Sequence, residues 1–127
     1  MSQKAQQLIA QAKAQNWKRL DLSNCGLTNL ATQVPELFTL TDLEELVLSN
    51  EWEEWNEAEQ EWEGKKSTNK GTPNKIDQLP EDLGKLVKLR VFICGGERDE
   101  IWGIKDISPL SGLTNLTTLD LSSNQFA

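Results

Sequence analysis

The stretch Leu116-Thr-Thr-Leu119-Asp-Leu121-Ser-Ser-Asn124-Gln-Phe126 decides how this chain of 127 residues folds. Its apolar residues and its asparagine follow the phase LxxLxLxxNxL, and four segments of the chain share that phase. A segment of this kind forms one strand and a return arm, and it buries its leucines only when a neighbouring segment stacks against it. The sequence therefore predicts a repeat architecture with one continuous core.

The other three copies keep the phase but are less regular. The first copy places Cys25 where the last copy has its asparagine, and the second and third copies are interrupted. Removing residues 51–73 restores the register of the second copy at Asn74, and removing a short stretch between Gly95 and Gly103 restores the third. We therefore expect two insertions, at residues 51–73 and about 95–103. The apolar positions of these copies are Trp17, Leu20, Leu22, Leu27 and Leu30; Leu43, Leu46, Leu48, Ile76, Leu79, Leu83 and Leu86; Leu89, Phe92, Cys94, Ile104, Ile107, Leu110 and Leu113.

The two ends of the chain differ from the repeats. Residues 1–16 are rich in Ala, Gln and Lys, which favour helices, and Leu8, Ile9 and Ala12 form one apolar stripe. We predict a capping helix that covers the first repeat, with a membrane-surface or partner helix as the alternative. No capping segment follows Phe126. We therefore expect either a fragment of a longer protein or an edge that is covered by self-association.

The first insertion carries an unusual side-chain composition. It contains Trp52, Trp55 and Trp62, together with seven glutamates and three lysines, which give it a net charge of −4. The i, i+3, i+10 spacing predicts a helix with the three tryptophans on one face. These tryptophans either fold back and anchor the insertion on the repeats or form a partner-binding lip, because Trp is a preferred hot-spot residue. The second insertion adds Arg98 and Trp102, which we expect beside the Trp-bearing helix.

The concave face of the predicted sheet has an apolar centre. Alternate strand residues point away from the leucines, and these include Val47, Val91 and Ile93 on neighbouring strands. Together with Trp52, Trp55, Trp62, Trp102 and Arg98, they are our candidate partner-binding residues. The alternative is that the insertion simply covers this apolar patch.

Composition excludes several function classes. The net charge of −7 disfavours nucleic acid, which selects basic surfaces, and no stretch approaches the length of a membrane span or signal peptide. Cys25 and Cys94 lie two repeats apart, about 10 Å, which exceeds the ~7 Å limit of a disulfide and predicts reduced thiols in a cytoplasmic setting. There is no histidine, no catalytic motif and no metal-ligand spacing, so we expect neither an enzyme nor a cofactor.

Over residues 17–126 the frame resembles the leucine-rich repeat superfamily. Leu79–Leu86 is similar to cytoplasmic signalling-type repeats, and Ile104–Leu116 is similar to internalin-type repeats. Leu20–Leu27 and Asn69–Ile76 resemble the N-terminal repeats of bacterial Roco-type proteins, in which the repeats precede a Ras-like GTPase module.

The resemblance implies a fold and a kind of function. The fold is an α/β right-handed solenoid of about four repeats over residues 17–127, with a short parallel sheet on the concave face and a capping helix over residues 1–16. The implied function is a protein–protein interaction module that binds a protein partner through the concave face and the Trp-rich insertions. One alternative is the regulatory segment of a larger Roco-type GTPase. Another is a structural unit that forms a homo-oligomer through the uncapped C-terminal edge.

Overall fold

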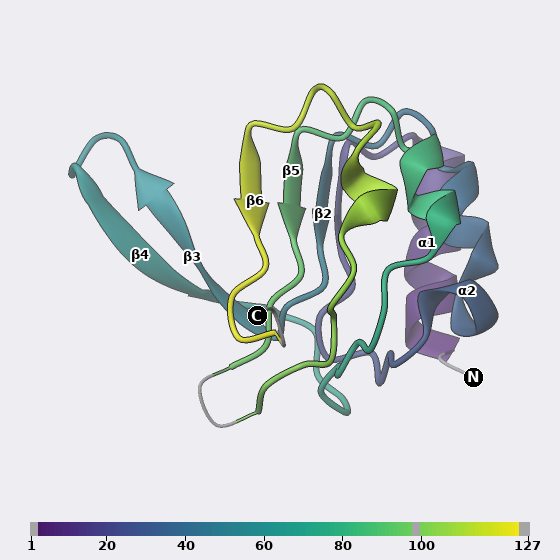
Figure 1. The fold of residues 1–127 in the computed structure, drawn as a ribbon, viewed down its shortest axis with the longest axis horizontal. Helices are drawn as coiled ribbons and strands as arrows, with labels where there is room; N and C mark the ends of the chain where they lie inside the picture. The colour runs from purple at the N-terminus through teal and green to yellow at the C-terminus, as the bar shows by residue number, and fades with distance from the viewer. Residues whose placement is uncertain (1–2, 98–99, 125–127) are drawn as a thin grey trace.

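A computed structural model describes residues 3–97 and 100–124. Helix α1 (Gln3–Gln15) begins the chain, and one three-residue strand follows in each repeat. These strands are β1 (Arg19–Asp21), β2 (Glu45–Val47), β5 (Val91–Ile93) and β6 (Thr118–Asp120). They lie side by side in one sheet in the order β1-β2-β5-β6, and every pair is parallel (Figure 1). The predicted parallel sheet with one strand per repeat is confirmed.

The register of the sheet lines up the central residue of every strand. Leu20 pairs with Leu46, Leu46 with Phe92, and Phe92 with Leu119. Because side chains alternate along a strand, these four central residues all point to the same face of the sheet. The first three are fully buried, and burying such a side chain contributes about 1.5–3 kcal/mol. This row of apolar residues forms one wall of the core.

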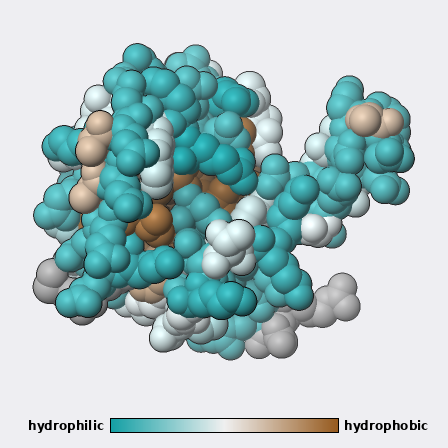
Figure 2. Space-filling model, turned by 180° about the vertical axis from the view of Figure 1, so that it is seen from behind, coloured by the Kyte–Doolittle hydropathy of each residue, from teal (hydrophilic) through white to brown (hydrophobic). Residues whose placement is uncertain are grey.

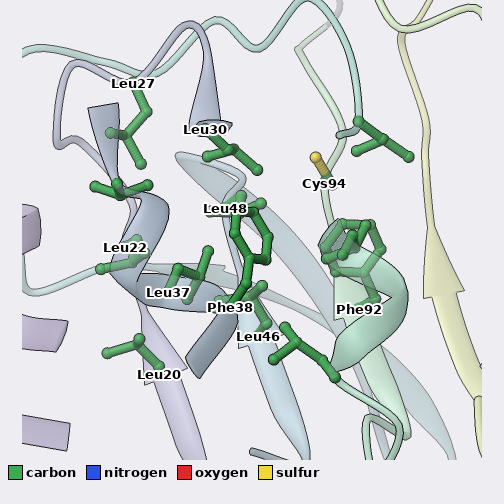
Figure 3. Packing of buried hydrophobic residues seen from close by; sticks show 14 of the residues in the cluster. Leu20, Leu22, Leu27, Leu30, Leu37, Phe38, Leu46, Leu48, Phe92 and Cys94 are labelled. Carbon is green, nitrogen blue, oxygen red and sulfur yellow. The ribbon is translucent and has the colours of Figure 1, made fainter. Parts of the chain in front are cut away.

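The return arms form the opposite wall and consist of short helical turns. They are α2 (Leu30–Gln33), η1 (Pro35–Thr39), η2 (Glu81–Lys85) and η3 (Ser108–Leu110). Leucines three apart fit a 3-10 turn, and the backbone follows: the Leu86 N–H donates to Leu83 and the Leu89 N–H donates to Leu86, at 3.1 and 3.0 Å. Figure 3 shows leucines from the strands and the return arms meeting between the two walls, with Phe38, Phe92 and Cys94 among them.

Helix α1 covers the end of the solenoid beside β1. Ala5, Ile9 and Ala12 are buried in the core, so the apolar stripe of this helix faces the first repeat as predicted. The helix ends at Gln15, because the φ of 52° at Asn16 breaks the helical backbone, and the Trp17 N–H then donates to the Ala12 carbonyl at 2.9 Å. No helix in residues 3–97 and 100–124 has the length and apolar character needed to span a membrane.

Asn74 joins the first two repeats through four hydrogen bonds. Its side-chain oxygen accepts from the N–H groups of Cys25 and Leu27, at 3.1 and 2.8 Å. Its side-chain NH2 donates to the carbonyls of Leu22 and Leu48, both at 2.8 Å. One buried amide therefore satisfies four backbone groups that water cannot reach. The repeat register does resume at Asn74.

The position that Asn74 holds in the second repeat is occupied by different residues in the other repeats. Asn124 donates to the Cys94 carbonyl at 3.1 Å and accepts from the Ile104 N–H at 3.2 Å, so it joins the third and fourth repeats. The first repeat has Cys25 at this position and the third has Trp102, two residues before Ile104 just as Asn74 precedes Ile76.

The first insertion forms a β-hairpin, and the predicted helix is wrong. Strand β3 (Glu51–Asn56) pairs antiparallel with β4 (Glu61–Lys66), and the hairpin projects away from the solenoid (Figure 1). A helix would place glutamates four residues apart next to one another, as at Glu53, Glu57 and Glu61, and such like-charge pairs are destabilising. The hairpin places Glu53 on β3, Glu57 in the turn and Glu61 on β4.

The turn of the hairpin follows from its residues. The Asn56 side-chain oxygen accepts from the Glu59 N–H at 3.1 Å, and the Gln60 side-chain amide donates to the Glu57 carbonyl at 2.9 Å. Gln60 has a φ of 56°, as expected near the end of a four-residue hairpin loop. Residues three apart on a strand lie on opposite faces, so Trp52 and Trp55 point to opposite faces of the hairpin.

Candidate functional site

The apolar patch of the concave face is covered by the root of the hairpin. Val47, Val91 and Ile93 point away from the leucine core, as predicted, and pack with Trp52 in a separate apolar cluster. Only 9% of Trp52 and of Val91 is exposed, and the other two residues are buried more completely. These four residues are therefore not free surface for a partner. The insertion covers the patch, which is the alternative considered from the sequence.

The two ends of the insertion are held together by side-chain amides. The Asn50 side-chain oxygen accepts from the Asn74 N–H at 2.9 Å, and its NH2 donates to the Asn74 carbonyl at 3.1 Å. The same oxygen accepts from the Asn24 N–H at 3.1 Å, so the first repeat is part of this contact. Asn50 and Asn74 are both buried. The chain thus leaves and re-enters the solenoid at a closed, hydrogen-bonded neck.

The segment between the hairpin and Asn74 lies on the loop that follows β1. The Ser67 hydroxyl donates to the Asp21 carboxylate at 2.7 Å, and the Asn69 side chain donates to the Asp21 and Ser23 carbonyls at 2.9 and 3.1 Å. The Gly26 N–H donates to the Thr72 carbonyl at 2.8 Å. Residues 67–72 are therefore part of the first repeat's hydrogen-bonding network and anchor the end of β4.

A charged group supports the hairpin on its inner face, the face that carries Trp52. The Arg19 guanidinium on β1 contacts the carboxylates of Glu45 and Glu54, at 2.8 and 3.2 Å. The Trp52 indole N–H donates to the same Glu54 at 2.6 Å. All these charges are partly solvated, so each ion pair contributes less than about 1 kcal/mol. Through Glu54 they link the hairpin to β1.

The outer face of the hairpin carries Trp55 and Trp62. These two residues pair directly across the strands, and their rings are 5.5 Å apart in an edge-to-face arrangement with an angle of 68° between planes. They are 46% and 62% exposed, the least buried aromatic residues of the hairpin. The Trp55 indole N–H donates to the Glu57 carboxylate, which holds that ring in place. Figure 2 shows the hairpin standing clear of the body, with a largely hydrophilic surface.

Trp102 lies elsewhere, and its predicted place beside the insertion tryptophans is wrong. It is fully buried in the leucine core, where it fills the position that asparagine holds in other repeats. Its indole N–H is the buried side-chain polar atom without a hydrogen-bond partner in the described part of the chain. The spacing Trp102-Gly103-Ile104, which matches Asn74-Lys75-Ile76, is the signal that indicated this position. Arg98 lies outside the described residues.

The second insertion lies next to the root of the hairpin. Glu97 and Glu100 form an antiparallel bridge with two backbone hydrogen bonds of 3.0 Å, and Glu100 also contacts Lys75 at 3.2 Å. Gly96 lets this segment approach its neighbours, because a Cβ there would lie 2.7 Å from the Ser123 carbonyl oxygen. A shallow hollow separates the two insertions, lined by Glu51, Trp52, Glu53, Gly64, Lys65, Lys66, Gly96 and Glu97. Both insertions therefore lie beyond the C-terminal ends of the neighbouring strands β2 and β5.

The thiols of Cys25 and Cys94 are unreactive. Burial, with a smaller contribution from Asp21, raises the pKa of Cys25 to about 11, and burial raises the pKa of Cys94 still further. Both cysteines are free and buried, so they stay protonated at neutral pH and are poor nucleophiles. They act as apolar residues of the core.

Comparison with known proteins agrees with this architecture. The family model of the leucine-rich repeat matches residues 16–39 and 115–127. Together with the parallel sheet, the inward leucines and the asparagine positions, this match shows a leucine-rich repeat fold. Such domains commonly serve as protein-interaction modules and are typically non-enzymatic scaffolds.

Among solved structures the chain is similar to internalin C2 from Listeria monocytogenes, with a TM-score of 0.56 and 23% sequence identity. The alignment covers 94% of this chain and 38% of that protein, so this chain spans well under half of its length. At this identity the likeness concerns the fold alone. The comparison with curated proteins finds no matching sequence.

Proposed function

We propose that this chain is a protein-recognition module that binds its partner through the outer face of the β3–β4 hairpin. The observation that carries the proposal is the exposed Trp55–Trp62 pair. Trp is the most enriched residue at binding hot spots because one side chain supplies a large apolar surface with few rotatable bonds. On this hairpin the two rings already pack against each other, so little side-chain entropy is lost when a partner covers them.

The anchoring of the hairpin supports the same proposal. A tryptophan pair on a floppy loop would bind weakly, because ordering the loop would oppose association. Here Trp52 packs on the sheet, Asn50 closes the neck and Ser67 joins the end of β4 to the first repeat. Three separate contacts therefore hold the strands before any partner arrives. The concave centre supports the root of the hairpin, through the packing of Trp52 with Val47, Val91 and Ile93.

A capture experiment tests this function. The chain is immobilised and exposed to an extract of its own source, beside a Trp55→Ala/Trp62→Ala variant and a Val87→Ala variant. Val87 is 53% exposed but lies away from the hairpin, in the turn after η2, so it serves as the matched control for removing an exposed apolar side chain. We expect a protein that the wild type and Val87→Ala retain and the double variant loses. Equal retention by all three folded proteins would contradict the proposed site.

Self-association is a second candidate, and the last two repeats favour it. Leu119 of the fourth repeat is 46% exposed and Ile107 of the third is 47% exposed, although both belong to the apolar frame of their repeats. Another copy of the chain could cover this edge. Light scattering over a range of concentrations tests the idea: the wild type should associate and Leu119→Asp should not. A wild type that stays monomeric at high concentration rules it out.

We also propose a reducing, cytoplasmic setting and a regulatory role toward a GTPase module. The buried, free thiols of Cys25 and Cys94 support a reducing, cytoplasmic compartment, which fractionation of the source cells would test. The resemblance of Leu20–Leu27 to Roco-type repeats supports a regulatory role toward a GTPase module. A coding sequence that contains no GTPase module would exclude that role.

A further inference from the structure

We infer that the partner of the hairpin is a polypeptide segment rich in arginine and lysine. This inference rests on the proposed function and specifies the chemistry of its binding site. It combines two independent features of the hairpin: a set of carboxylates that the chain itself leaves unpaired, and two exposed indole rings beside them.

Three glutamates of the hairpin form ion pairs and four do not, and three of those four lie at or beside its turn. Glu51 contacts Lys66, Glu54 contacts Arg19 and Glu63 contacts Lys65. The remaining glutamates have no Lys or Arg nitrogen within ion-pairing distance in residues 3–97 and 100–124. These unpaired carboxylates are Glu53, Glu57, Glu59 and Glu61.

Several basic side chains of the solenoid are already ion-paired with carboxylates of the solenoid itself. Arg90 contacts Glu44 and Glu45, Lys88 contacts Asp42, and Lys85 contacts Asp82. Most basic groups near the sheet and the return arms thus have an acidic partner in the chain. The tip of the hairpin carries Glu57, Glu59 and Glu61 within five residues, on a segment that extends into solvent (Figure 2). Such a potential attracts a positively charged partner and speeds its association.

The tryptophan pair adds a contact that charge alone does not supply. A guanidinium or ammonium group stacks favourably on an indole face, and Trp is the best aromatic residue for this interaction. Trp55 and Trp62 lie on the same outer face as Glu53, because cross-strand partners and alternate residues share a face. An arginine on these rings can also form an ion pair with Glu53 or Glu57. Rings and carboxylates together select a basic side chain.

The same observations argue against other occupants. A second copy of this chain has a net charge of −7 and would bring its own acidic hairpin, so like charges would oppose hairpin-to-hairpin contact. Nucleic acid and anionic lipid are repelled for the same reason. A purely apolar segment would leave Glu53 without a partner at the interface and would take the charged Glu57 carboxylate out of water, which costs desolvation energy.

Indole resonances in a proton–nitrogen NMR spectrum test the inference, because each of the five tryptophans gives its own signal. The probes are synthetic peptides of equal length that alternate serine with arginine, lysine, glutamate or leucine. We expect the arginine peptide, and more weakly the lysine peptide, to shift the signals of Trp55 and Trp62 but not that of buried Trp102. The glutamate and leucine peptides should leave all signals in place.

Matched variants separate specific binding from general charge attraction. Trp55→Ala/Trp62→Ala keeps the net charge and should weaken the arginine peptide about tenfold or more, since two cation–π contacts are lost. Glu59→Gln/Glu61→Gln should weaken it several-fold, whereas Glu36→Gln/Glu81→Gln, which removes the same charge from exposed positions in η1 and η2, should have little effect. Equal affinity of the arginine peptide for the wild type and the Trp double variant would overturn the inference.

Failure of the inference is distinguishable from failure of the proposed function. If the leucine or glutamate peptide shifts Trp55 and Trp62 and the arginine peptide does not, the basic partner is wrong while the tryptophan site stands. If no peptide shifts these signals, the basic partner is also rejected, and the capture experiment decides on the site by itself. Circular dichroism of each variant confirms that it is folded.

Discussion

Replacing Asn74 with alanine should remove a large part of the stability of this solenoid. The change leaves four backbone groups without their partner: the N–H groups of Cys25 and Leu27 and the carbonyls of Leu22 and Leu48. A hydrogen bond contributes about 0.5–1.5 kcal/mol net, so four predict a loss of about 2–6 kcal/mol. Asn74 is 1% exposed, which favours the upper half of that range because water cannot easily replace the lost amide.

Urea unfolding measures this loss. Trp102 is fully buried in the core, so the total tryptophan fluorescence includes a signal from unfolding of the solenoid itself, and circular dichroism provides a second probe. We expect the midpoint to fall while the slope with urea stays the same, because the change alters stability and not the area exposed on unfolding. A total stability of about 5–15 kcal/mol would be cut substantially.

Two other asparagines provide controls. Asn124→Ala removes weaker bonds at a partly buried position and should cost about half as much as Asn74→Ala. Asn115→Ala removes a single exposed bond, from its side chain to the Val87 carbonyl, and should cost less than about 1 kcal/mol. If Asn74→Ala proves no more costly than Asn115→Ala, the amide does not join the repeats as we argue.

Three further predictions concern the hairpin and the thiols. Trp52→Ala should lower the free energy of unfolding by about 2–4 kcal/mol, because the hairpin loses its contact with Val47, Val91 and Ile93. It should also speed amide hydrogen exchange in residues 51–66, and unchanged exchange would show that Trp52 does not anchor the hairpin. Trp62→Ala should cost only about 0.5–1.5 kcal/mol in the same urea assay, since this ring is mostly exposed, and a larger loss would mean that the pair is structural. Burial, as the main cause, raises the pKa of Cys25 from 9.0 to about 11, so the thiol ionises in the unfolded chain at a lower pH than in the folded protein. The free energy of unfolding should therefore fall by about 1 kcal/mol per pH unit between about pH 9 and pH 11. The Cys25→Ala variant should show a shallower fall with pH, and equal slopes in the two proteins would contradict this account.

The spacing of the repeats predicts most of the fold. Inward leucines at a fixed offset predict the four strands, and Leu83, Leu86 and Leu89 predict the helical turns of the return arm. The neck of the first insertion was also predictable, because only Asn74 restores the register. These features depend on side chains that must meet a neighbour in the core, so their spacing is constrained.

The insertion was harder to predict because its tryptophans do not meet a common core. Trp52 packs on the sheet, whereas Trp55 faces away, and a spacing of three suits both a helix face and opposite faces of a strand. The like-charged neighbours Glu53, Glu57 and Glu61 are the signal that disfavoured a helix. The cover over Val47 and Ile93 depends on how the hairpin folds back, which no local pattern records. The sequence did single out Trp55 and Trp62, though not their separation from Trp102.

The closed neck at Asn50 and Asn74 makes the insertion an exchangeable part. The repeats on either side keep their register whatever lies between these residues, and each doubling of a flexible loop costs only about 0.6 kcal/mol once its ends are joined. A foreign hairpin placed between Trp52 and Ser67 would inherit the seat on the sheet and the attachment to the first repeat. The solenoid is therefore a natural scaffold for displaying a two-stranded binding element of chosen sequence.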